Sequence, residues 1–368
     1  MSTAEIQYFA LLRSALWDAP LSIEGPIEWK AVMQIADFHG NSILVSDLAA
    51  RMPDDYRPSP KMLGKMQDDL RGNLINLLRL RQHLCRVVKL LREQGIEPVL
   101  LKGFGLARLY PNPSLRQFGD IDLFVGLAHF HEACALLRAL PDAFTWCIEA
   151  DSGRHYNVEF GDIVFEIHRV SADVVDTREH DMYTAIEQDG LKEHPQHVDL
   201  DGFEILVPSK EFTVFFTFYH AWHHFLTTGV GWRQLSDVAM ALHSYHGQLD
   251  LDKLSQWLGS MSLMKPWQAF GYLIVDRLGL PEEEMPFYDK TCRRKAERLY
   301  RQIMKEGNFR RANNFKRMKP KRGFWHKVHA FICVFVDFFH RVWVFPSHAF
   351  REMVTSIKAG FGKNFQKN

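Results

Sequence analysis

The stretch that most constrains the fold is residues 98–125, PVLLKGFGLARLYPNPSLRQFGDIDLFV, because strand, turn, helix and strand signals follow one another closely in it. The apolar run Val99–Leu101 predicts a buried strand. Gly103 and Gly105 come next, and glycine allows a sharp turn or a close approach of the backbone to a ligand. We therefore expect a buried strand that ends in a turn able to face a ligand.

Two aspartates stand at the start of the next predicted strand, over 121–125. A short helix over 106–110 precedes it and should end at Pro111, because proline lacks an amide hydrogen. In an extended chain alternate side chains share one face, so Asp120 and Asp122 point the same way. Two neighbouring like charges are unfavourable in a half-buried strand unless a cation neutralises them, and Mg²⁺ prefers carboxylate oxygens. The simpler alternative, which is commoner for an isolated Asp-x-Asp, is an acidic strand end facing solvent.

Four short motifs in this stretch, taken together, resemble a known family. In order they are Leu101-Lys102-Gly103, Leu109-Tyr110-Pro111, Arg116 and Asp120-Ile121-Asp122-Leu123-Phe124-Val125. The pattern is similar to that of an uncharacterised bacterial nucleotidyltransferase family within the DNA polymerase beta-like nucleotidyltransferase superfamily. The superfamily usually has a glycine-serine turn, whereas Phe104-Gly105 follow Gly103 here. This departure affects the contacts expected with a triphosphate.

The resemblance implies a site that binds both a metal and a nucleotide. Asp120, Asp122 and a third carboxylate from a later strand would be catalytic and would hold Mg²⁺ or Mn²⁺. The expected nucleotide-binding residues are Lys102, Gly103, Phe104, Gly105, Arg116 and Arg233. The implied reaction is transfer of a nucleoside monophosphate from a nucleoside triphosphate to an acceptor, with loss of pyrophosphate.

The third carboxylate has to be sought in a later strand with alternating residues. The runs 155–160 and 163–169 alternate and are joined by Gly161-Asp162, which predicts a hairpin. Glu166 lies in the second run, and Glu166-Ile167-His168 matches the acidic, apolar and His order of the resembled family. Glu166 is therefore our candidate, with Glu159 and Asp162 as alternatives and a surface position for Glu166 as the simpler interpretation.

Arg233 belongs to the segment 229–237, GVGWRQLSD, which resembles a glycine, arginine and aspartate segment of the same family. A planar guanidinium group matches a phosphate group well. The alternative is an Arg233–Asp237 ion pair at helical i, i+4 spacing, which would only stabilise the helix. His220 and His224 also share a helical face, but the sequence offers no evident third ligand, so we do not favour zinc.

The chain divides into four predicted regions in an α+β fold, with a nucleotidyltransferase-type mixed sheet between helical N-terminal and C-terminal regions. They are a helical region at 1–97, a catalytic core at 98–207, a helical region closing the cleft at 208–291 and a basic, aromatic helical tail at 292–368. Further predicted elements are a long helix over 61–94, a helix over 128–140, a hairpin over 197–207 and a helix after Ser209.

The tail differs from the rest of the chain in charge. It holds 19 Lys and Arg against 4 Asp and Glu, which gives +15, and the whole chain is +1, so the rest carries −14. Interleaved basic and aromatic residues suit nucleic acid or an anionic membrane surface. The alternative is a tail folded back on the acidic body. The apolar part, 331–345, is shorter than the roughly 20 residues that span a bilayer, so we expect an amphipathic helix.

Other features narrow the class of protein. The start lacks a basic segment followed by an apolar core, so we expect no secretory signal. Five scattered cysteines without CxxC spacing indicate reduced thiols and a cytoplasmic protein. P-loop, GxGxxG and GxSxG motifs are absent. We expect a metal-dependent nucleotidyltransferase with an unidentified acceptor. The alternatives are an inactive nucleotide-binding module and a membrane-associated protein of surface polysaccharide assembly.

Overall fold

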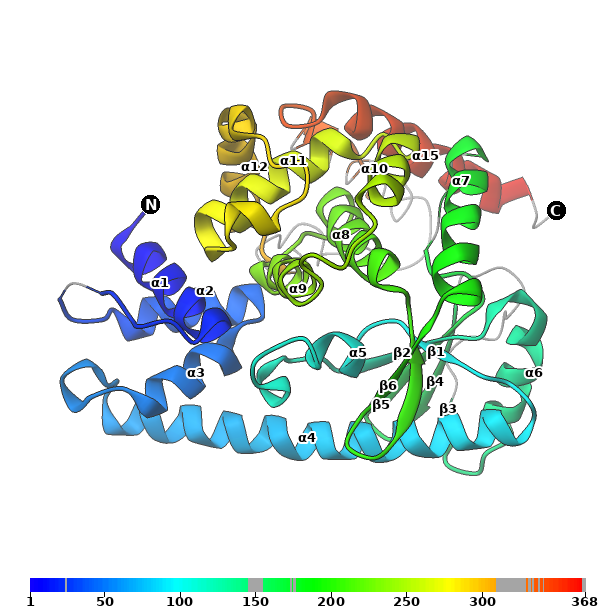
Figure 1. The fold of residues 1–368 in the computed structure, drawn as a ribbon, viewed down its shortest axis with the longest axis horizontal. Coiled ribbons are helices and arrows are strands. Elements are labelled where there is room, and N and C mark those ends of the chain that lie inside the picture. Colours follow the sequence, from blue (N-terminus) through cyan, green and yellow to red (C-terminus); the bar gives the residue numbers. More distant parts are fainter. Residues whose placement is uncertain are drawn as a thin grey trace.

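A mixed β-sheet lies beside a larger assembly of helices (Figure 1). The computed structural model describes residues 1–23, 25–144, 155–172, 174, 177–308 and 341–365, and positions 329, 332, 334–336, 338 and 339. Within these residues the α+β class predicted from the sequence is confirmed.

The described strands form one seven-stranded sheet in the order β3-β4-β5-β2-β1-β7-β6. They are β1 Val99–Leu100, β2 Asp120–Phe124, β3 Ala143–Phe144, β4 His155–Phe160, β5 Ile163–His168, β6 Gln196–Asp199 and β7 Glu204–Val207. The pairs β2–β5 and β1–β7 are parallel, and the remaining pairs are antiparallel. The sheet is therefore mixed, with β2 and β5 adjacent near its centre.

Helices surround this sheet and build most of the molecule. They are α1 Thr3–Trp17, α2 Trp29–His39, α3 Ser42–Arg51, α4 Pro60–Glu93, α5 Phe104–Ala107, α6 Gly126–Arg138, α7 Thr177–Glu187, α8 Lys210–Leu226, α9 Trp232–Ser244, α10 Leu251–Ser260, α11 Met264–Leu273, α12 Arg293–Glu306 and α15 Pro346–Phe365. Short turns of other helix types are η1 Asp54–Tyr56, η2 Pro113–Leu115, η3 Gln188–Glu193, η4 Ile274–Leu278, η5 Glu282–Glu284 and η6 Lys290–Cys292.

The two faces of the sheet have different neighbours. On one face Ile121 of β2 and Phe165 of β5 share a core with Leu84 of α4 and Leu137 of α6. Alternation along the strands turns the polar residues of β2 and β5 to the other face. There Phe124 joins a second core, which α8, α9 and the N-terminal helices build. The polar residues therefore lie between the sheet and the helical part.

Most predicted elements are confirmed, because local periodicity determines them. The hairpins β4–β5 and β6–β7 form where predicted, and α4 covers almost all of 61–94. The Ser209 side chain accepts a hydrogen bond from the Phe212 amide and caps α8. The helix predicted over 106–110 is wrong in position, since α5 ends at Ala107. The reason is that Gly103, at φ +59°, turns the chain so sharply that the helix starts at once.

The described end of the tail packs on the helical part. Val344, Phe345 and Ala349 are buried, and Arg341 Nε donates to the Phe225 carbonyl at the end of α8 at 2.7 Å. Arg351 of α15 forms an ion pair with Glu179 of α7. Most of the basic residues of the tail, from Arg310 to Arg322, lie outside the described residues, as does part of 331–345. In the part that is described, the tail therefore contacts the body.

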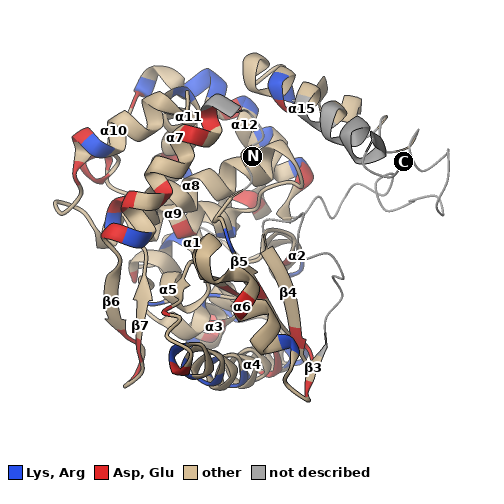
Figure 2. Cartoon of the chain, turned by 90° about the vertical axis from the view of Figure 1, so that its right-hand side faces the viewer, with Lys and Arg blue, Asp and Glu red and all other residues tan. Residues whose placement is uncertain are grey.

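Charged residues of both signs are interspersed on the surface. Figure 2 shows Lys and Arg close to Asp and Glu on α4 and α10. Among the described residues, no helix combines the length and the apolar character needed to cross a membrane. Three described cysteines, Cys85, Cys134 and Cys292, are free thiols, and Cys147 and Cys333 lie outside the described residues.

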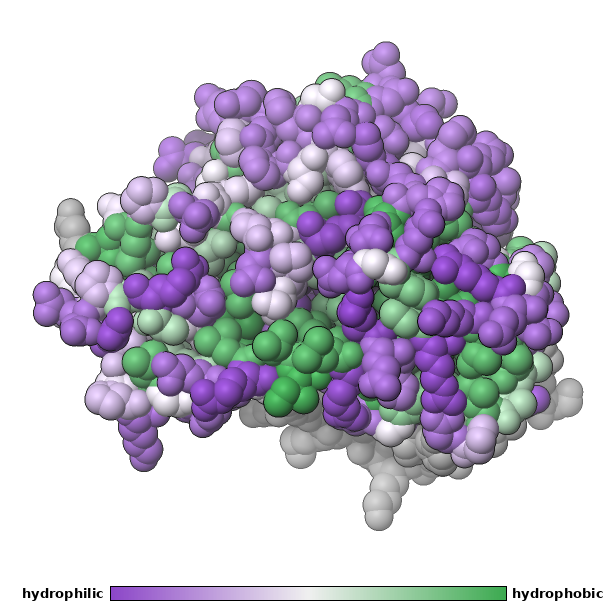
Figure 3. Space-filling model, turned by 60° about the horizontal axis from the view of Figure 1, so that its bottom comes forward, coloured by the Kyte–Doolittle hydropathy of each residue, from purple (hydrophilic) through white to green (hydrophobic). Residues whose placement is uncertain are grey.

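The long helix α4 carries an exposed apolar face. Leu74, Ile75 and Leu78 lie within two turns of one another, and all three are exposed. Figure 3 shows hydrophobic side chains gathered on the underside of the molecule, where α4 runs. The opposite side of α4 supplies the core residues that pack beneath the sheet.

Candidate functional site

The three predicted carboxylates share one face of the sheet. In the parallel pair β2–β5, Asp122 lies directly opposite Glu166, and Asp120 lies opposite Val164. Side chains that face each other on neighbouring strands are close enough to interact. The pairing thus places Asp122 beside Glu166, with Asp120 two residues along the same face. Glu159, an alternative third carboxylate, lies on β4 and pairs with Val164 of β5. It is therefore one strand farther from Asp120 than Glu166 is.

Asp122 is the centre of a buried charge cluster. Lys102 Nζ lies 2.9 Å from Asp122 Oδ1, and His168 Nε2 lies 3.0 Å from the same oxygen. His168 Nε2 is also 3.3 Å from Glu166 Oε2. A carboxylate can only accept, so the His168 Nε2–H group is the donor. Lys102 and His168 therefore hold the like-charged carboxylates of Asp122 and Glu166 together.

The pKa values of the cluster follow from these contacts. Burial alone would raise the pKa of Asp122, but the Lys102 charge and the His168 hydrogen bond hold that pKa well below its usual range. The hydrogen bond from His168 likewise lowers the pKa of Glu166 against the effect of burial. Although part of Asp120 reaches solvent, the protein atoms crowded around its carboxylate raise its pKa, and the Asp122 charge adds to this. Lys102 has a raised pKa, because the three carboxylates outweigh its burial. The cluster thus keeps Asp122 and Glu166 ionised.

A cavity of about 170 Å³ opens beside this cluster. Sheet and turn residues form one wall, and α8 and α9 form the other. Its lining residues are Lys102, Gly103, Leu106, Arg116, Phe118, Asp120, Glu166, Phe216, Thr217, His220, His224, Arg233, Gln234 and Asp237. The cavity therefore brings together two predicted carboxylates and the predicted basic residues, and Asp122 lies buried beneath it.

The glycine turn is shaped by close packing. A Cβ atom at Gly103 would lie 3.3 Å from the Phe118 ring, and one at Gly105 would lie 3.3 Å from the Leu100 carbonyl oxygen. Phe104 packs edge-to-face on Phe118, with ring centroids 4.8 Å apart. Gly103, Phe104 and Gly105 were predicted to bind nucleotide. Among the described residues that line the cavity, Gly103 is present and Phe104 and Gly105 are not.

Arg116 is buried and fully engaged. Its Nε and Nη2 donate to the two carboxylate oxygens of Asp237 at 2.6 and 2.9 Å, and its Nη1 donates to the Gly103 carbonyl at 3.2 Å. Tyr110 also donates its hydroxyl to Asp237, at 2.8 Å. Arg116 thus braces the glycine turn against α9, and its contact with phosphate stays a prediction.

Arg233 lines the cavity and is not paired with Asp237 among the described residues. The alternative Arg233–Asp237 ion pair does not form, since within the described residues Asp237 bonds with Arg116 and Tyr110 instead. Arg233 Nη1 donates to the Gln117 carbonyl at 2.8 Å, while its buried Nε has no hydrogen-bond partner there. Burial and the nearby Arg116 charge lower its pKa. Arg233 therefore lines the cavity with one unpaired donor, and its contact with an anionic group stays a prediction.

His220 and His224 of α8 line the cavity wall that faces the carboxylates. Their Nε2 atoms are 3.1 Å apart, and His224 Nδ1 lies 2.6 Å from Thr228 Oγ1. One ring must donate to the other, so the two cannot both be charged without repulsion. Neither belongs to a group of three or more potential metal ligands in the described residues.

The donor atoms present suit a divalent metal. Asp122 Oδ2 is buried and has no hydrogen-bond partner among the described residues, so one carboxylate oxygen of the cluster remains available. Carboxylate oxygens suit Mg²⁺. His155, Glu166 and His168 also form a group whose ligand atoms all lie within 4.8 Å of one another. Imidazole ligands suit transition metals such as Zn²⁺ and Fe²⁺ better than they suit Mg²⁺.

The sequence did not identify three residues that matter here. Alternation places His168 on the same face as Glu166, but the sequence suggests no role for His168 in the site. Tyr110 carries only the family resemblance, and for Asp237 the sequence suggests Arg233 as a possible partner and not Arg116. For Asp237 no local signal exists, because its partner is 121 residues away.

The mixed sheet, the glycine turn before a helix and the paired carboxylates on the sheet face define a nucleotidyltransferase fold. The chain belongs to the family of uncharacterised nucleotidyltransferases, whose family pattern matches residues 25–279. The resemblance seen in the short motifs is thereby confirmed.

One solved structure with detectable similarity is the solution structure of the antibiotic-resistance factor ANT(2'')-Ia, described as revealing substrate-regulated conformation dynamics. It is 14% identical, with 51% of this chain and 92% of that chain covered and a TM-score of 0.37. No curated protein sequence matches the chain significantly.

Proposed function

We propose that this protein transfers a nucleoside monophosphate from a nucleoside triphosphate to an acceptor, with a divalent metal held by Asp120, Asp122 and Glu166. The observation that carries the proposal is the register of β2 and β5, which sets Asp122 opposite Glu166 on the face that looks into the cavity. Family membership supports the reaction class.

Each group of residues has a task in this proposal. Asp120, Asp122 and Glu166 hold Mg²⁺ or Mn²⁺, which when bound offsets charge on the triphosphate and on the attacking and leaving oxygens. Lys102 and Arg233 face the phosphates as cationic donors. Arg116 keeps the glycine turn in place from behind. The acceptor oxygen or nitrogen forms a bond to the α-phosphorus, the bond to pyrophosphate breaks, and the acceptor loses its proton to a base or to water.

The size of the cavity bears on how a nucleotide binds. Small-molecule sites commonly occupy about 300–1,000 Å³, and this cavity holds about 170 Å³. Phosphates fit such a volume, but a whole nucleotide does not. We therefore expect the phosphates in the cavity and the nucleoside at its mouth, or a movement of α8 and α9 away from the sheet on binding.

The test is a transfer assay with each α-³²P-labelled nucleoside triphosphate, Mg²⁺ or Mn²⁺, and pools of small molecules, protein and RNA as acceptors. Pyrophosphate release and labelled product are measured together. Glu166→Gln and Asp122→Asn should abolish both, and each should weaken Mn²⁺ binding measured by electron paramagnetic resonance. Glu159→Gln is the matched control, because Glu159 lies on the same face one strand away. Equal activity of wild type and Glu166→Gln would refute the assigned role.

The same assay separates the alternatives. An inactive nucleotide-binding module would bind nucleoside triphosphate with metal and release no pyrophosphate. A protein of surface polysaccharide assembly that works at membranes would sediment with anionic liposomes through its basic tail, and nucleic acid binding would appear as salt-sensitive retention of RNA. We favour a cytoplasmic enzyme, in keeping with the free described cysteines.

A further inference from the structure

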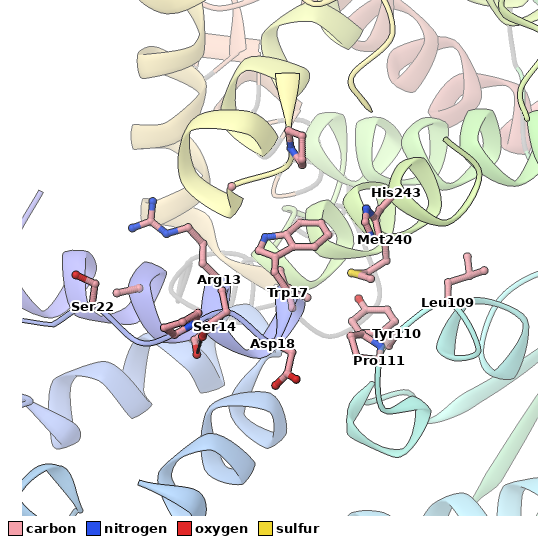
Figure 4. A pocket seen from close by; sticks show the side chains of 16 residues that line it. Arg13, Ser14, Trp17, Asp18, Ser22, Leu109, Tyr110, Pro111, Met240 and His243 are labelled. Atoms are coloured by element: carbon pink, nitrogen blue, oxygen red, sulfur yellow. Dashed lines mark hydrogen bonds between the residues drawn. The ribbon is translucent and has the colours of Figure 1, made fainter. Parts of the chain in front are cut away.

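A second cavity in this protein is separate from the carboxylate cluster. It has a volume of about 700 Å³ and lies between the end of α1, the loop after α5, α9 and the turn after η4 (Figure 4). Its volume falls in the range of about 300–1,000 Å³ that small-molecule sites occupy. None of the proposed metal ligands lines it. A molecule held there would therefore not be the group that reacts at the carboxylates.

Rigid aromatic side chains form part of its wall. The Trp17 indole Nε1–H donates to the Leu278 carbonyl at 2.5 Å, which fixes the ring. The His243 ring stands edge-to-face to Trp17 at 5.2 Å, and its Nδ1 lies 2.7 Å from Glu284. Buried Leu109 and Met240 add apolar surface. Walls already held in place suit a flat or compact apolar group, because little ordering is needed on binding.

Arg13 gives the cavity a charged group that the protein itself does not use. Its aliphatic stem packs near Gly279, where a Cβ atom would lie 3.0 Å from Arg13 Cδ. Among the described residues its guanidinium makes no hydrogen bond or ion pair. Asp18 also lines the cavity, and Figure 4 shows its carboxylate pointing away from Arg13. An anionic group on a ligand can therefore reach Arg13 without meeting that carboxylate.

Tyr110 links this cavity to the candidate active site. Its ring lines the 700 Å³ cavity, and its buried hydroxyl donates to Asp237 at 2.8 Å. Asp237 in turn holds Arg116, which donates to the Gly103 carbonyl in the turn of the nucleotide site. Met240 lines the same cavity from one turn farther along α9 than Asp237. A ligand that presses on Tyr110 thus acts on the group that braces the glycine turn.

We propose that this cavity is an effector site for a small molecule with an apolar ring system and one anionic group, which Arg13 recognises, and that Tyr110 transmits its binding to the nucleotide site. The coupling to nucleotide rests on the function proposed above. Binding in the cavity does not, and it can be tested alone.

Two fluorescent probes with nearly the same rings test the binding. 8-Anilinonaphthalene-1-sulfonate carries an anionic group, and N-phenyl-1-naphthylamine does not. In full-length protein without nucleotide or metal, Arg13→Gln should lower the affinity for the sulfonate probe by about tenfold, because one charged hydrogen bond is lost. The affinity for the neutral probe should stay unchanged. Arg13→Lys should recover most of the affinity, and Arg51→Gln, an exposed arginine in α3, should have no effect. Equal affinity of wild type and Arg13→Gln for the sulfonate would overturn the site.

The second arm tests the coupling. With the sulfonate probe saturating, the affinity for a fluorescent nucleoside triphosphate with Mg²⁺ should change by about fivefold or more, and the nucleotide should change probe affinity by the same factor. Tyr110→Phe keeps the ring but removes the hydroxyl, so probe binding should persist and the coupling should vanish. Coupling that survives Tyr110→Phe would refute the transmission step. If no triphosphate binds at all, the proposed function fails. The probe measurements would still show whether the cavity binds an anionic ligand through Arg13.

Discussion

Arg116 and Asp237 are 121 residues apart in the sequence, and their side chains meet inside the protein in two parallel hydrogen bonds of 2.6 and 2.9 Å. Both side chains are only 4–5% exposed. Arg116 precedes the carboxylate strand, and Asp237 lies on α9, so the pair joins the sheet part to the helical part. Because Arg116 also holds the Gly103 carbonyl, the same contact fixes the turn at the candidate active site.

Removing the charge of Asp237 should destabilise the protein strongly. Asp237→Asn leaves the Arg116 guanidinium buried without its counter-ion, and breaking a buried pair in this way costs about 3–5 kcal/mol. Urea unfolding measures the loss. Asp162→Asn is the matched control, because Asp162 pairs with Arg79 at an exposed position and should hardly change the midpoint. A similar effect of the two substitutions would contradict the structural weight given to the buried pair.

Arg233 should contribute to binding of phosphate. Arg233→Gln removes a guanidinium that lines the cavity and has an unpaired Nε, so affinity for a nucleoside triphosphate should fall by about tenfold. Affinity for the corresponding nucleoside should change little. Fluorescence titration with labelled nucleotide and nucleoside gives both values. Arg71→Gln, at an exposed position of α4, serves as control. An equal loss for nucleotide and nucleoside would show that Arg233 acts through the fold instead.

His39 should make the free energy of unfolding fall at low pH. Its ring is fully buried in α2, both ring nitrogens lack hydrogen-bond partners in the described residues, and burial lowers its pKa to about 3. In the unfolded chain the pKa is about 6.5. A lowered pKa means that the unfolded state binds more protons between these values, so stability is fully present above pH of about 6.5 and falls below it. The slope approaches about 1.4 kcal/mol per pH unit.

Comparison with His39→Phe checks this at several pH values. The unfolding free energies of wild type and variant should run parallel above pH of about 7 and diverge below about 6, with the wild type losing more. Parallel curves down to pH of about 4 would show that His39 is solvated or paired in the folded protein.

Phe345 should anchor the tail to the body. Its buried ring stands edge-to-face to Trp222 at 4.9 Å and lies 6.0 Å from Phe225. Phe345→Ala should therefore cost about 3–5 kcal/mol of stability. Trp343→Ala, at a position 72% exposed, should cost far less. If thermal unfolding shifts no more for Phe345→Ala than for Trp343→Ala, the tail is not docked in solution and is free to meet a membrane or nucleic acid.

The sequence predicted those parts of the site that depend on alternation along a strand. Asp120 and Asp122 were expected on one face of a strand, and β2 has them there, with Ile121 in the core. The hairpin that carries Glu166 was predicted for the same reason, because β4 and β5 alternate and a glycine turn joins them. Whether Glu166 is a metal ligand stays a prediction, which the comparison of Glu166→Gln with Glu159→Gln decides.

The sequence failed where a residue has a partner outside its own segment. Helical spacing suggested Asp237 as the partner of Arg233, but Arg116 arrives from another region and takes both carboxylate oxygens. The short helix was placed too late, because sequence pattern does not give the φ of Gly103 or its packing against Phe118.

What the sequence by itself determined is the set of elements and the family, since both depend on short-range patterns: periodic apolar residues, glycine turns and four motifs in order. What only the tertiary structure decided is which charged groups meet. The parallel pairing of β2 with β5 set Asp122 beside Glu166 and His168, and the packing of β1 against β2 brought Lys102 to Asp122. Register and distant ion pairs depend on how whole elements pack, and no local pattern in the chain records that.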